Sequence, residues 1–219
     1  MGVKVAKFGG TSLASAEAFR KVKAIVLADS SRCFVVPSAP GKRAAEDQKV
    51  TDLLYQCHDR VIQGLDFADL FAQIRKRYQD IVTGLDLDLD INKYLDQIEQ
   101  QLPNQSQPDY AASRGEYLNG IILAAYLGWE FVDPTEIIRF NSHGFLDLLQ
   151  TEQLIAARLS PERPAVIPGF FGSMPDGSVK TFPRGGSDIT GALIARGVKA
   201  DLYENWTDVS GFYMADPRI

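Results

Sequence analysis

The chain has 219 residues, a length that suits one large domain or two small ones. Its composition is ordinary for a soluble globular protein, with 45% hydrophobic residues, 23% charged residues and a formal net charge of −5. This negative balance, together with the lack of any dense run of lysine and arginine, argues against a nucleic-acid-binding surface and against binding to anionic membranes.

The N-terminus has no apolar core of the kind found in signal peptides, and no apolar run approaches the length of a membrane span. We therefore expect a cytoplasmic protein. Cys33 and Cys57 lie far apart in apolar or helical settings, which indicates reduced, structural thiols. His58 and His143 have no partner signature, so neither a zinc site nor a Ser–His or Cys–His nucleophile is expected.

A strand, a glycine turn and a helix start open the chain. Residues 3–8 form the predicted strand, and Gly9-Gly10 breaks it before an amphipathic helix. Glycine lets backbone N–H groups approach a phosphate, and the helix N-terminus adds partial positive charge. Lys7, just before the turn, is placed to add a full charge. An ordinary βα turn with a surface lysine is the competing interpretation.

Further along the chain, continuous apolar runs predict strands, and apolar residues at helical spacing predict helices. The strands are expected over 33–36, 129–132, 165–168, 179–182 (a hairpin strand) and 201–205, and the helices over 15–29, 49–64, 67–84, 93–102, 110–127, 151–159 and 189–197. Strands alternating with helices throughout predict a mostly parallel sheet with helices on both faces. Ligands of such sheets bind at the carboxyl ends of the strands.

Two more glycine-containing segments follow predicted strands. Residues 37–43 (PSAPGKR) combine glycine, hydroxyl and positive charge, and a ligand loop and a plain turn are equally open interpretations. Residues 184–188 (RGGSD) form a second Gly-Gly turn that leads into a helix beside a cation, and two such turns are harder to attribute to chance than one. The loop 206–218 carries aromatic, hydroxyl, acidic and basic groups and is too polar for a core.

Two charged clusters are not expected to form sites. The aspartates within 86–90 alternate with leucine as in a calcium loop, but Ile91 stands where glycine is needed and Gln97 where the final carboxylate belongs. The start of the helix over 93–102 explains this segment better. The basic residues at 75–77 are expected to lie on a solvated helix surface.

The chain has no Walker A sequence, no GxGxxG fingerprint and no protein-kinase catalytic loop. What remains is a set of glycine turns with two cations, Lys7 and Arg184, and two carboxylates, Asp188 and Asp208. Such a set suits phosphoryl transfer, in which the protein positions groups and neutralises charge around a bound metal. If the acceptor is itself a carboxylate, no general base is needed, and the lack of a catalytic histidine is then expected.

Several short motifs are spread over the chain in a fixed order. They are KFGGTS at 7–12, VPSAPG at 36–41 with VTDLL at 50–54, SRGE at 113–116, GF at 169–170, RGGSDIT at 184–190, and WTD at 206–208 through DPR at 216–218. In this combination the chain resembles the aspartate kinases of the amino acid kinase family. The resemblance implies a three-layer α/β/α sandwich with a mostly parallel central sheet, and an amino acid kinase catalytic domain over residues 1–219.

The implied reaction converts ATP and L-aspartate to 4-phospho-L-aspartate and ADP, the first step towards lysine, threonine and methionine. By this resemblance Lys7 contacts the transferring phosphates and Asp188 orients the cationic groups that hold them. Arg184 pairs with the substrate's α-carboxylate and Glu116 with its α-amino group. This fits a zwitterion, which needs one group of each sign. Hydroxyl contacts to the substrate are implied for Ser38, Thr51 and Ser187.

The nucleotide site is also implied by the resemblance, with Mg²⁺ bridging the phosphates and no dedicated protein metal site. Gly9 and Gly10 supply N–H donors in it. The residues implied to bind the nucleotide are Lys7, Gly9, Gly10, Thr207, Asp208, Tyr213, Asp216 and Arg218.

Two features depart from the family pattern. Residues 42–49 (KRAAEDQK) make the approach to Thr51 longer than in many relatives, and the chain stops at Ile219, where relatives continue into more kinase domain and regulatory ACT domains. We therefore expect an incomplete catalytic domain with weak or no kinase activity, and any homo-oligomer is expected to form mainly through the absent regulatory domains. The alternatives are another acceptor (glutamate, acetylglutamate, carbamate or UMP) and a non-catalytic module that binds nucleotide or amino acid.

Overall fold

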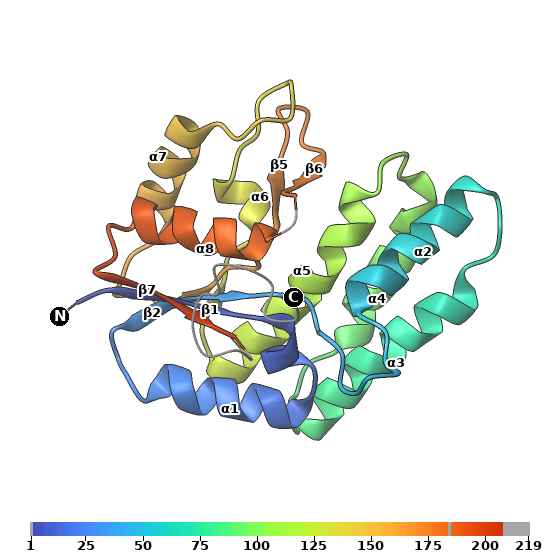
Figure 1. Cartoon of the computed structure of the whole chain (residues 1–219), viewed down its shortest axis with the longest axis horizontal. Helices are drawn as coiled ribbons and strands as arrows, with labels where there is room; N and C mark the ends of the chain where they lie inside the picture. Colours follow the sequence, from blue (N-terminus) through green and yellow to red (C-terminus); the bar gives the residue numbers. More distant parts are fainter. Residues whose placement is uncertain (1, 184, 208–219) are drawn as a thin grey trace, which may run out of the picture.

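Five parallel strands form the central sheet of the protein, shown in Figure 1 as a computed structural model that describes residues 2–183 and 185–207. The strands follow the order β3-β4-β2-β1-β7. Their bounds are Lys4–Phe8 (β1), Arg32–Pro37 (β2), Glu130–Phe131 (β3), Ala165–Val166 (β4) and Leu202–Trp206 (β7). Every neighbouring pair in this sheet is parallel, which confirms the predicted sheet type.

Helices cover both faces of the sheet because both faces of its strands are apolar. Along β1, Ala6 and Phe8 join the core on one face, whereas Val5 joins the core on the other. The first face is covered by α1 (Ala16–Leu27) and α5 (Asp109–Leu127), and the second by α6 (Pro134–Ile137), α7 (Leu148–Arg158) and α8 (Gly186–Gly197). This arrangement confirms the predicted three-layer α/β/α sandwich.

Four helices in succession separate β2 from β3, so the expectation of strands alternating with helices throughout is wrong here. They are α2 (Val50–Ile62), α3 (Ala68–Gly84), α4 (Ile91–Gln101) and α5. The first three form a lobe beside the sheet (Figure 1), and α5 joins this lobe to the sheet face that it covers. No strand lies between these four helices that they could cover. Their apolar faces are therefore buried largely against one another, through residues such as Leu54, Tyr78 and Leu95.

Shorter elements complete the architecture. An antiparallel hairpin of β5 (Phe171–Ser173) and β6 (Val179–Thr181) forms a second sheet and confirms the predicted hairpin. Two 3-10 helices, η1 (Gly10–Leu13) and η2 (Leu102–Asn104), follow β1 and α4. Helix α6 is a single helical turn that was not predicted, because the sequence around it lacks helical periodicity.

Capping residues mark the ends of three of the predicted helices. Ser15 accepts a hydrogen bond from the N–H of Ala18 at 3.3 Å at the start of α1, and Gly128 ends α5 with a left-handed φ of 71°. Asp90 accepts a hydrogen bond from the N–H of Asn92 and caps α4. The acidic segment before α4 is therefore a helix start, as predicted.

The cysteines and histidines occupy structural positions. Cys33 and Cys57 are buried and free, as expected for structural thiols. His58 is buried on α2, and His143 is exposed in a loop. Across residues 2–183 and 185–207, no helix is long and apolar enough to cross a membrane.

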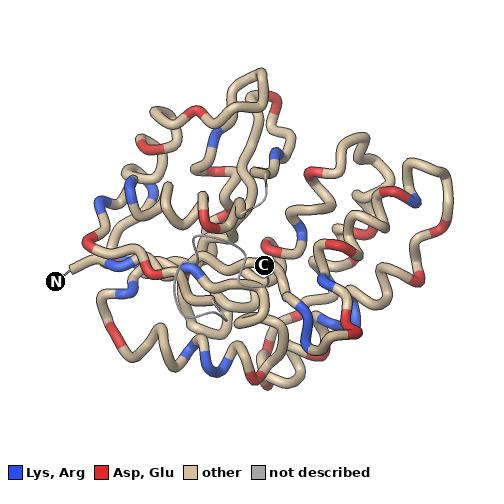
Figure 2. Tube along the Cα trace, viewed as in Figure 1, with Lys and Arg blue, Asp and Glu red and all other residues tan. Residues whose placement is uncertain are grey.

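Basic and acidic residues are interspersed along the chain, as Figure 2 shows. One cation predicted to lie on the surface is buried. The Lys76 side chain is 75% exposed, in agreement with a solvated helix surface. The side chain of Arg77 is only 5% exposed, pairs with Asp47 at 2.5 Å and donates to the carbonyl of Gly41 at 3.0 Å. The prediction is wrong for Arg77 because the polar segment 42–49 folds over α3 and covers it.

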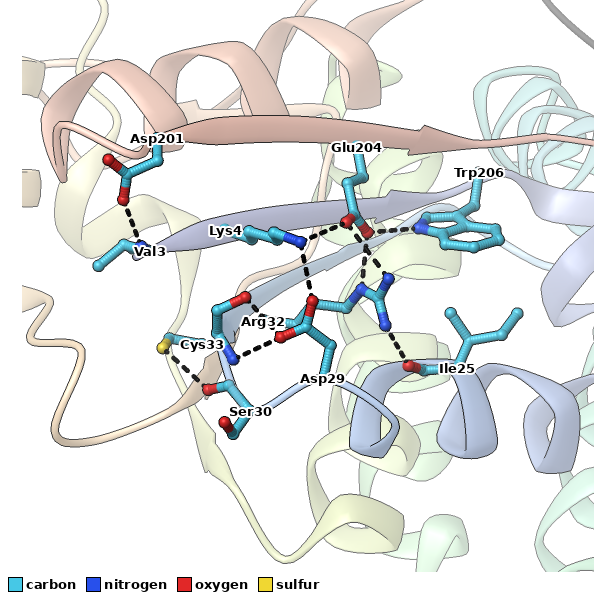
Figure 3. A network of polar contacts seen from close by, with 11 residues as sticks. Val3, Lys4, Ile25, Asp29, Ser30, Arg32, Cys33, Asp201, Glu204 and Trp206 are labelled. Carbon is cyan, nitrogen blue, oxygen red and sulfur yellow. Dashed lines mark hydrogen bonds and ion pairs between the residues drawn. The ribbon is translucent and has the colours of Figure 1, made fainter. Parts of the chain in front are cut away.

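A charged network ties together β1, β2 and β7 on one face of the sheet, as Figure 3 shows. Arg32 and Glu204 form an ion pair at 2.7 Å, and each side chain is 13% exposed. Glu204 also accepts a hydrogen bond from Trp206 Nε1 at 2.9 Å, and Lys4 Nζ lies 2.8 Å from Asp29. Burial opposes ionisation of Glu204, but hydrogen bonds from Arg32 and Trp206 outweigh it and lower the pKa of the carboxyl.

Two loops cross with their backbones in contact at the carboxyl ends of β1 and β2. The N–H of Gly41 donates to the carbonyl of Gly10 at 2.8 Å. A Cβ at Gly41 would lie 2.8 Å from the Gly10 carbonyl carbon and 2.8 Å from the Thr11 nitrogen. These distances are closer than real Cβ contacts, so glycine is what allows the loop after β2 to reach the turn after β1.

We expect Glu204→Ala to lower the free energy of unfolding by about 3 kcal/mol at pH 7, because Arg32 then stays buried without its carboxylate. Urea denaturation measures the change. The folded pKa of Glu204 lies below its unfolded value of 4.5, so the difference from wild type should shrink as the pH falls below that value.

The control for this variant is Glu17→Ala, which removes an ion pair with Lys21 whose side chains are 71% and 74% exposed. This loss should cost less than about 0.5 kcal/mol. Equal losses for Glu204→Ala and Glu17→Ala would contradict a stabilising role of the network.

We expect Gly41→Ala to lower the free energy of unfolding by about 1–3 kcal/mol, because the added methyl forces the crossing loops apart. Urea denaturation is again the measurement. Gly9→Ala is the matched control, since a Cβ there would meet the Trp206 oxygen at an ordinary 3.6 Å. If both alanine variants unfold alike, the loop crossing is not the constraint we describe.

Candidate active site

A cavity of about 230 Å³ lies where β1 and β2 end and α8 begins. Its lining residues are Lys7, Ser38, Thr51, Glu116, Phe170, Gly185, Gly186, Ser187 and Asp188. Every described residue that the sequence assigned to catalysis or to the acceptor is among them. A larger cavity of about 450 Å³ shares Ser38, Thr51 and Glu116 and extends to Gly10, Gly41, Lys42 and Lys49. The glycine turns after β1 and β2 therefore meet at one edge of the sheet.

Lys7 supplies the cation of the smaller cavity. Its side chain is 9% exposed, and its Nζ lies 2.7 Å from Oδ1 of Asp188 in the first turn of α8. Asn205 on β7 is the register partner of Lys7, so both side chains leave the same face of the sheet. The Asn205 amide donates to the same Oδ1 at 3.0 Å. Asp188 is thus held from two strands, while its side chain stays 46% exposed.

Glu116 is a buried carboxyl group on α5, and the residue is 6% exposed. The backbone N–H of Ala39 hydrogen-bonds to it, but its Oε2 has no hydrogen-bond partner among the described residues. Burial raises the pKa of Glu116 to about 8, because the bond from Ala39 offsets only part of the desolvation. An unpartnered, buried carboxyl oxygen on a cavity wall favours a cationic ligand group.

Ser38 and Thr51 bring hydroxyl groups to both cavities. Asn119, fully buried on α5 one turn beyond Glu116, donates its amide to the carbonyl of Ser38 at 2.7 Å and so fixes the loop after β2. Thr51 lies in the first turn of α2, so the long segment 42–49 does not remove it from the site. Asn119 was not predicted as a site residue, because it lies inside a long apolar helix and belongs to no recognisable motif.

Phe170 lines the smaller cavity in a left-handed conformation, with φ of 84°, that is rare for residues other than glycine. Its N–H donates to Oγ1 of Thr190 at 3.0 Å, and that hydroxyl donates to the carbonyl of Gly186 at 3.1 Å. Thr190 is fully buried and binds the loop before β5 to the first turn of α8. No motif in the sequence indicates this role.

The residues predicted to bind the nucleotide are only partly assembled at this site. Gly10 borders the larger cavity, but the N–H of Gly9 donates to the carbonyl of Trp206 at 3.0 Å. A role for Gly9 as a phosphate donor would require that hydrogen bond to break. Thr207 borders a different cavity, of about 350 Å³, beside α1. The other residues predicted to bind the nucleotide lie outside the described residues: Asp208, Tyr213, Asp216 and Arg218. Arg184, predicted to bind the substrate's α-carboxylate, lies outside them as well.

The arrangement suits an anion beside an ammonium group. Helix α8 begins after Gly185, whose φ is 79°, and its first-turn N–H groups and dipole favour negative charge. Lys7 adds a full positive charge there, and Glu116 offers a partner for a cation. Among residues 2–183 and 185–207, no cluster of three or more histidine, cysteine, aspartate or glutamate residues could hold a metal ion.

Comparison with solved structures shows the same fold in aspartate kinases. The structure of Clostridium acetobutylicum aspartate kinase superposes with a TM-score of 0.94 and is 51% identical, over 100% of this chain and 51% of that chain. The structure of Escherichia coli aspartokinase III in complex with aspartate and ADP gives a TM-score of 0.84 at 29% identity, over 99% of this chain and 51% of that chain.

Sequence comparison agrees with the structural one. Aspartokinase 3 of Bacillus subtilis is 40% identical over 99% of this chain and 51% of its own length. The chain therefore spans about half the length of the curated relatives it matches. Residues 2–219 match the amino acid kinase family. Since this match takes in nearly every residue, including all those that line both cavities, the chain belongs to the amino acid kinase family.

Proposed function

We propose that this site transfers the γ-phosphoryl group of Mg-ATP to the side-chain carboxylate of L-aspartate. One observation carries the proposal: a single cavity contains both Lys7, which lies beside the first turn of α8, and the unpartnered carboxyl group of Glu116. A transferring phosphate needs cations and N–H donors, and an amino acid needs an anionic partner for its α-ammonium group. The names of the relatives and the E. coli complex with aspartate and ADP support this choice of substrates.

In the proposed reaction, a carboxylate oxygen of aspartate attacks the γ-phosphorus. The bond from that phosphorus to the β–γ bridging oxygen breaks, and ADP leaves with the electron pair. The acceptor carboxylate is already ionised near neutral pH, so no general base is needed. Lys7 neutralises charge that spreads over the phosphoryl oxygens, and Asp188 and Asn205 keep its ammonium group in place.

The amino-acid end of the substrate is assigned to the part of the cavity that Glu116 lines. Glu116 takes the α-ammonium group, and Arg184 is proposed to pair with the α-carboxylate. Ser38, Thr51 and Ser187 line the same cavity, and their hydroxyl groups are proposed to contact the substrate. Recognition by one group of each sign selects a zwitterion over a simple dicarboxylate.

The nucleotide is proposed to bring Mg²⁺ with it, which would supply positive charge to the phosphates. Mg²⁺ usually keeps several waters and binds through phosphates and one or two carboxylates, so it needs no cage of protein ligands. The half-exposed carboxylate of Asp188 is suited to be one of these few carboxylate ligands. Gly10 is proposed to face the phosphates, and the proposed nucleotide contacts are Thr207, Asp208, Tyr213, Asp216 and Arg218. A cytoplasmic location and a place in lysine, threonine and methionine biosynthesis belong to the same proposal.

Lys7→Ala tests the proposed phosphate end. We expect aspartate-dependent ADP release from Mg-ATP, followed in a coupled assay, to fall about 10²–10³-fold, the usual loss when one preorganised charge is removed. Lys76→Ala, on the exposed surface of α3, should leave the rate unchanged. ADP release by the wild-type chain that is independent of aspartate, or equal rates for both variants, would contradict the proposal.

The raised pKa of Glu116 predicts a pH dependence for aspartate binding. Below about pH 8 the free carboxyl is mostly protonated, yet the ammonium group needs the carboxylate, so binding should release a proton. The affinity for L-aspartate should therefore rise about tenfold per pH unit from pH 6 towards 8 and then level off. Calorimetry in buffers of different ionisation enthalpy measures both effects.

Glu116→Gln is the control for this pH dependence. It should weaken aspartate binding at pH 8 and remove the proton release, while Mg-ATP binding keeps its wild-type pH profile. Aspartate binding with no pH dependence in the wild-type chain would show that Glu116 does not meet the ammonium group.

A further inference from the structure

The smaller cavity has two walls that come from separate parts of the chain. One wall belongs to α5, which carries Glu116. The other wall is formed by the segments on either side of the β5–β6 hairpin. Phe170 immediately precedes β5, and the 185–188 turn follows β6 after a short connection. The separation of these walls therefore depends on how the hairpin is held against α5.

Asp109, the first residue of α5, is bonded directly to β6. Its carboxylate accepts hydrogen bonds from the N–H of Thr181 at 2.8 Å and from the Thr181 hydroxyl at 2.7 Å. Lys180 adds an ion pair at 3.2 Å. The Asp109 side chain is 11% exposed, so these bonds are shielded from solvent. An aspartate needed only to complement the helix dipole would not require a partner on another element.

Arg114, one turn further along α5, contacts β5. Its guanidinium carbon lies 5.2 Å from the centre of the Phe171 ring, and the rings of Tyr110 and Tyr117 lie at 4.6 Å and 4.5 Å. Arg114 is 7% exposed and has no ion pair among the described residues, so its charge is stabilised by the aromatic faces and Ser113. Phe171 is the residue next to Phe170, which lines the cavity.

We propose that Asp109 and Arg114 are positioning residues that hold the β5–β6 hairpin against α5 and so set the width of the amino-acid pocket. Asp109 holds the strand that leads to the 185–188 turn, and Arg114 holds the strand that begins beside Phe170. Both residues lie on α5, shortly before Glu116. The identification of the pocket as the aspartate site rests on the proposed function.

The test compares Asp109→Ala and Asp109→Asn in the full chain, with L-aspartate and Mg-ATP as separate calorimetric probes. Asp109→Ala should weaken aspartate binding about tenfold or more, because the hairpin wall loses charge-assisted hydrogen bonds, and should change Mg-ATP affinity less than about threefold. Asp109→Asn keeps an oxygen that can accept from Thr181 and should recover much of the aspartate affinity.

Asp29→Ala is the matched control. Asp29 also accepts from a backbone N–H and a hydroxyl, both of Ser31, and pairs with a lysine, Lys4 at 2.8 Å (Figure 3). It lies just before β2, at the amino ends of the strands, whereas the cavity lies at their carboxyl ends. This variant should lose stability and keep both affinities. If Asp29→Ala and Asp109→Ala weaken aspartate binding alike, or if Asp109→Ala binds aspartate as wild type does, the positioning role is overturned.

Amide hydrogen exchange without ligand separates this proposal from the proposed function. Asp109→Ala and Arg114→Leu should speed exchange in residues 171–181 and 185–188 more than in β1 or β2. Unchanged exchange there overturns the positioning role whatever the chain binds. A wild-type chain that binds no aspartate overturns the proposed function, and the exchange result still decides whether the hairpin is held by α5.

Discussion

The ion pair between Lys7 and Asp188 is the constraint on which the site depends. A lysine that is 9% exposed at the end of a central strand is costly unless a carboxylate meets it, so the first turn of α8 must lie against the end of β1. Asn205 on β7 binds the same carboxylate oxygen, which links this requirement to the β1–β7 register. One pair therefore fixes the start of α8 against two strands and leaves one face of the carboxylate open to the cavity.

Close backbone approaches surround that pair and explain the glycines of the motifs. Gly41 touches Gly10 where the two loops cross. On α5, a Cβ at Gly115 would lie 2.7 Å from the Cβ of Ala39, so the absence of a side chain brings Glu116 next to the loop after β2. The Tyr78 hydroxyl donates to the Gly115 carbonyl at 2.8 Å and holds the helical lobe at the same place. The lobe and the sheet thus meet at the wall of the site.

Features that depend on local chemistry could be predicted from the sequence: the glycine break after β1, the Ser15 cap and the alternating core faces of a buried parallel sheet. Features set by distant partners could not. The burial of Arg77 depends on an aperiodic segment that folds over it, and the role of Asn205 depends on a strand pairing with β1. The same pairing engages the N–H of Gly9 with Trp206, which the glycine motif alone does not reveal.

The two ends of the cavity are prepared differently, and this difference bears on substrate choice. At the proposed phosphate end, Lys7 is already paired with Asp188, so its ammonium group is oriented before any ligand arrives. At the other end, Glu116 is buried with one oxygen unpartnered, a state that costs folding free energy whenever the group is ionised. Only a ligand that carries its own cation relieves that cost. The α-ammonium group of an amino acid would do so, whereas a plain dicarboxylate or carbamate brings no cation and would leave Glu116 protonated below about pH 8.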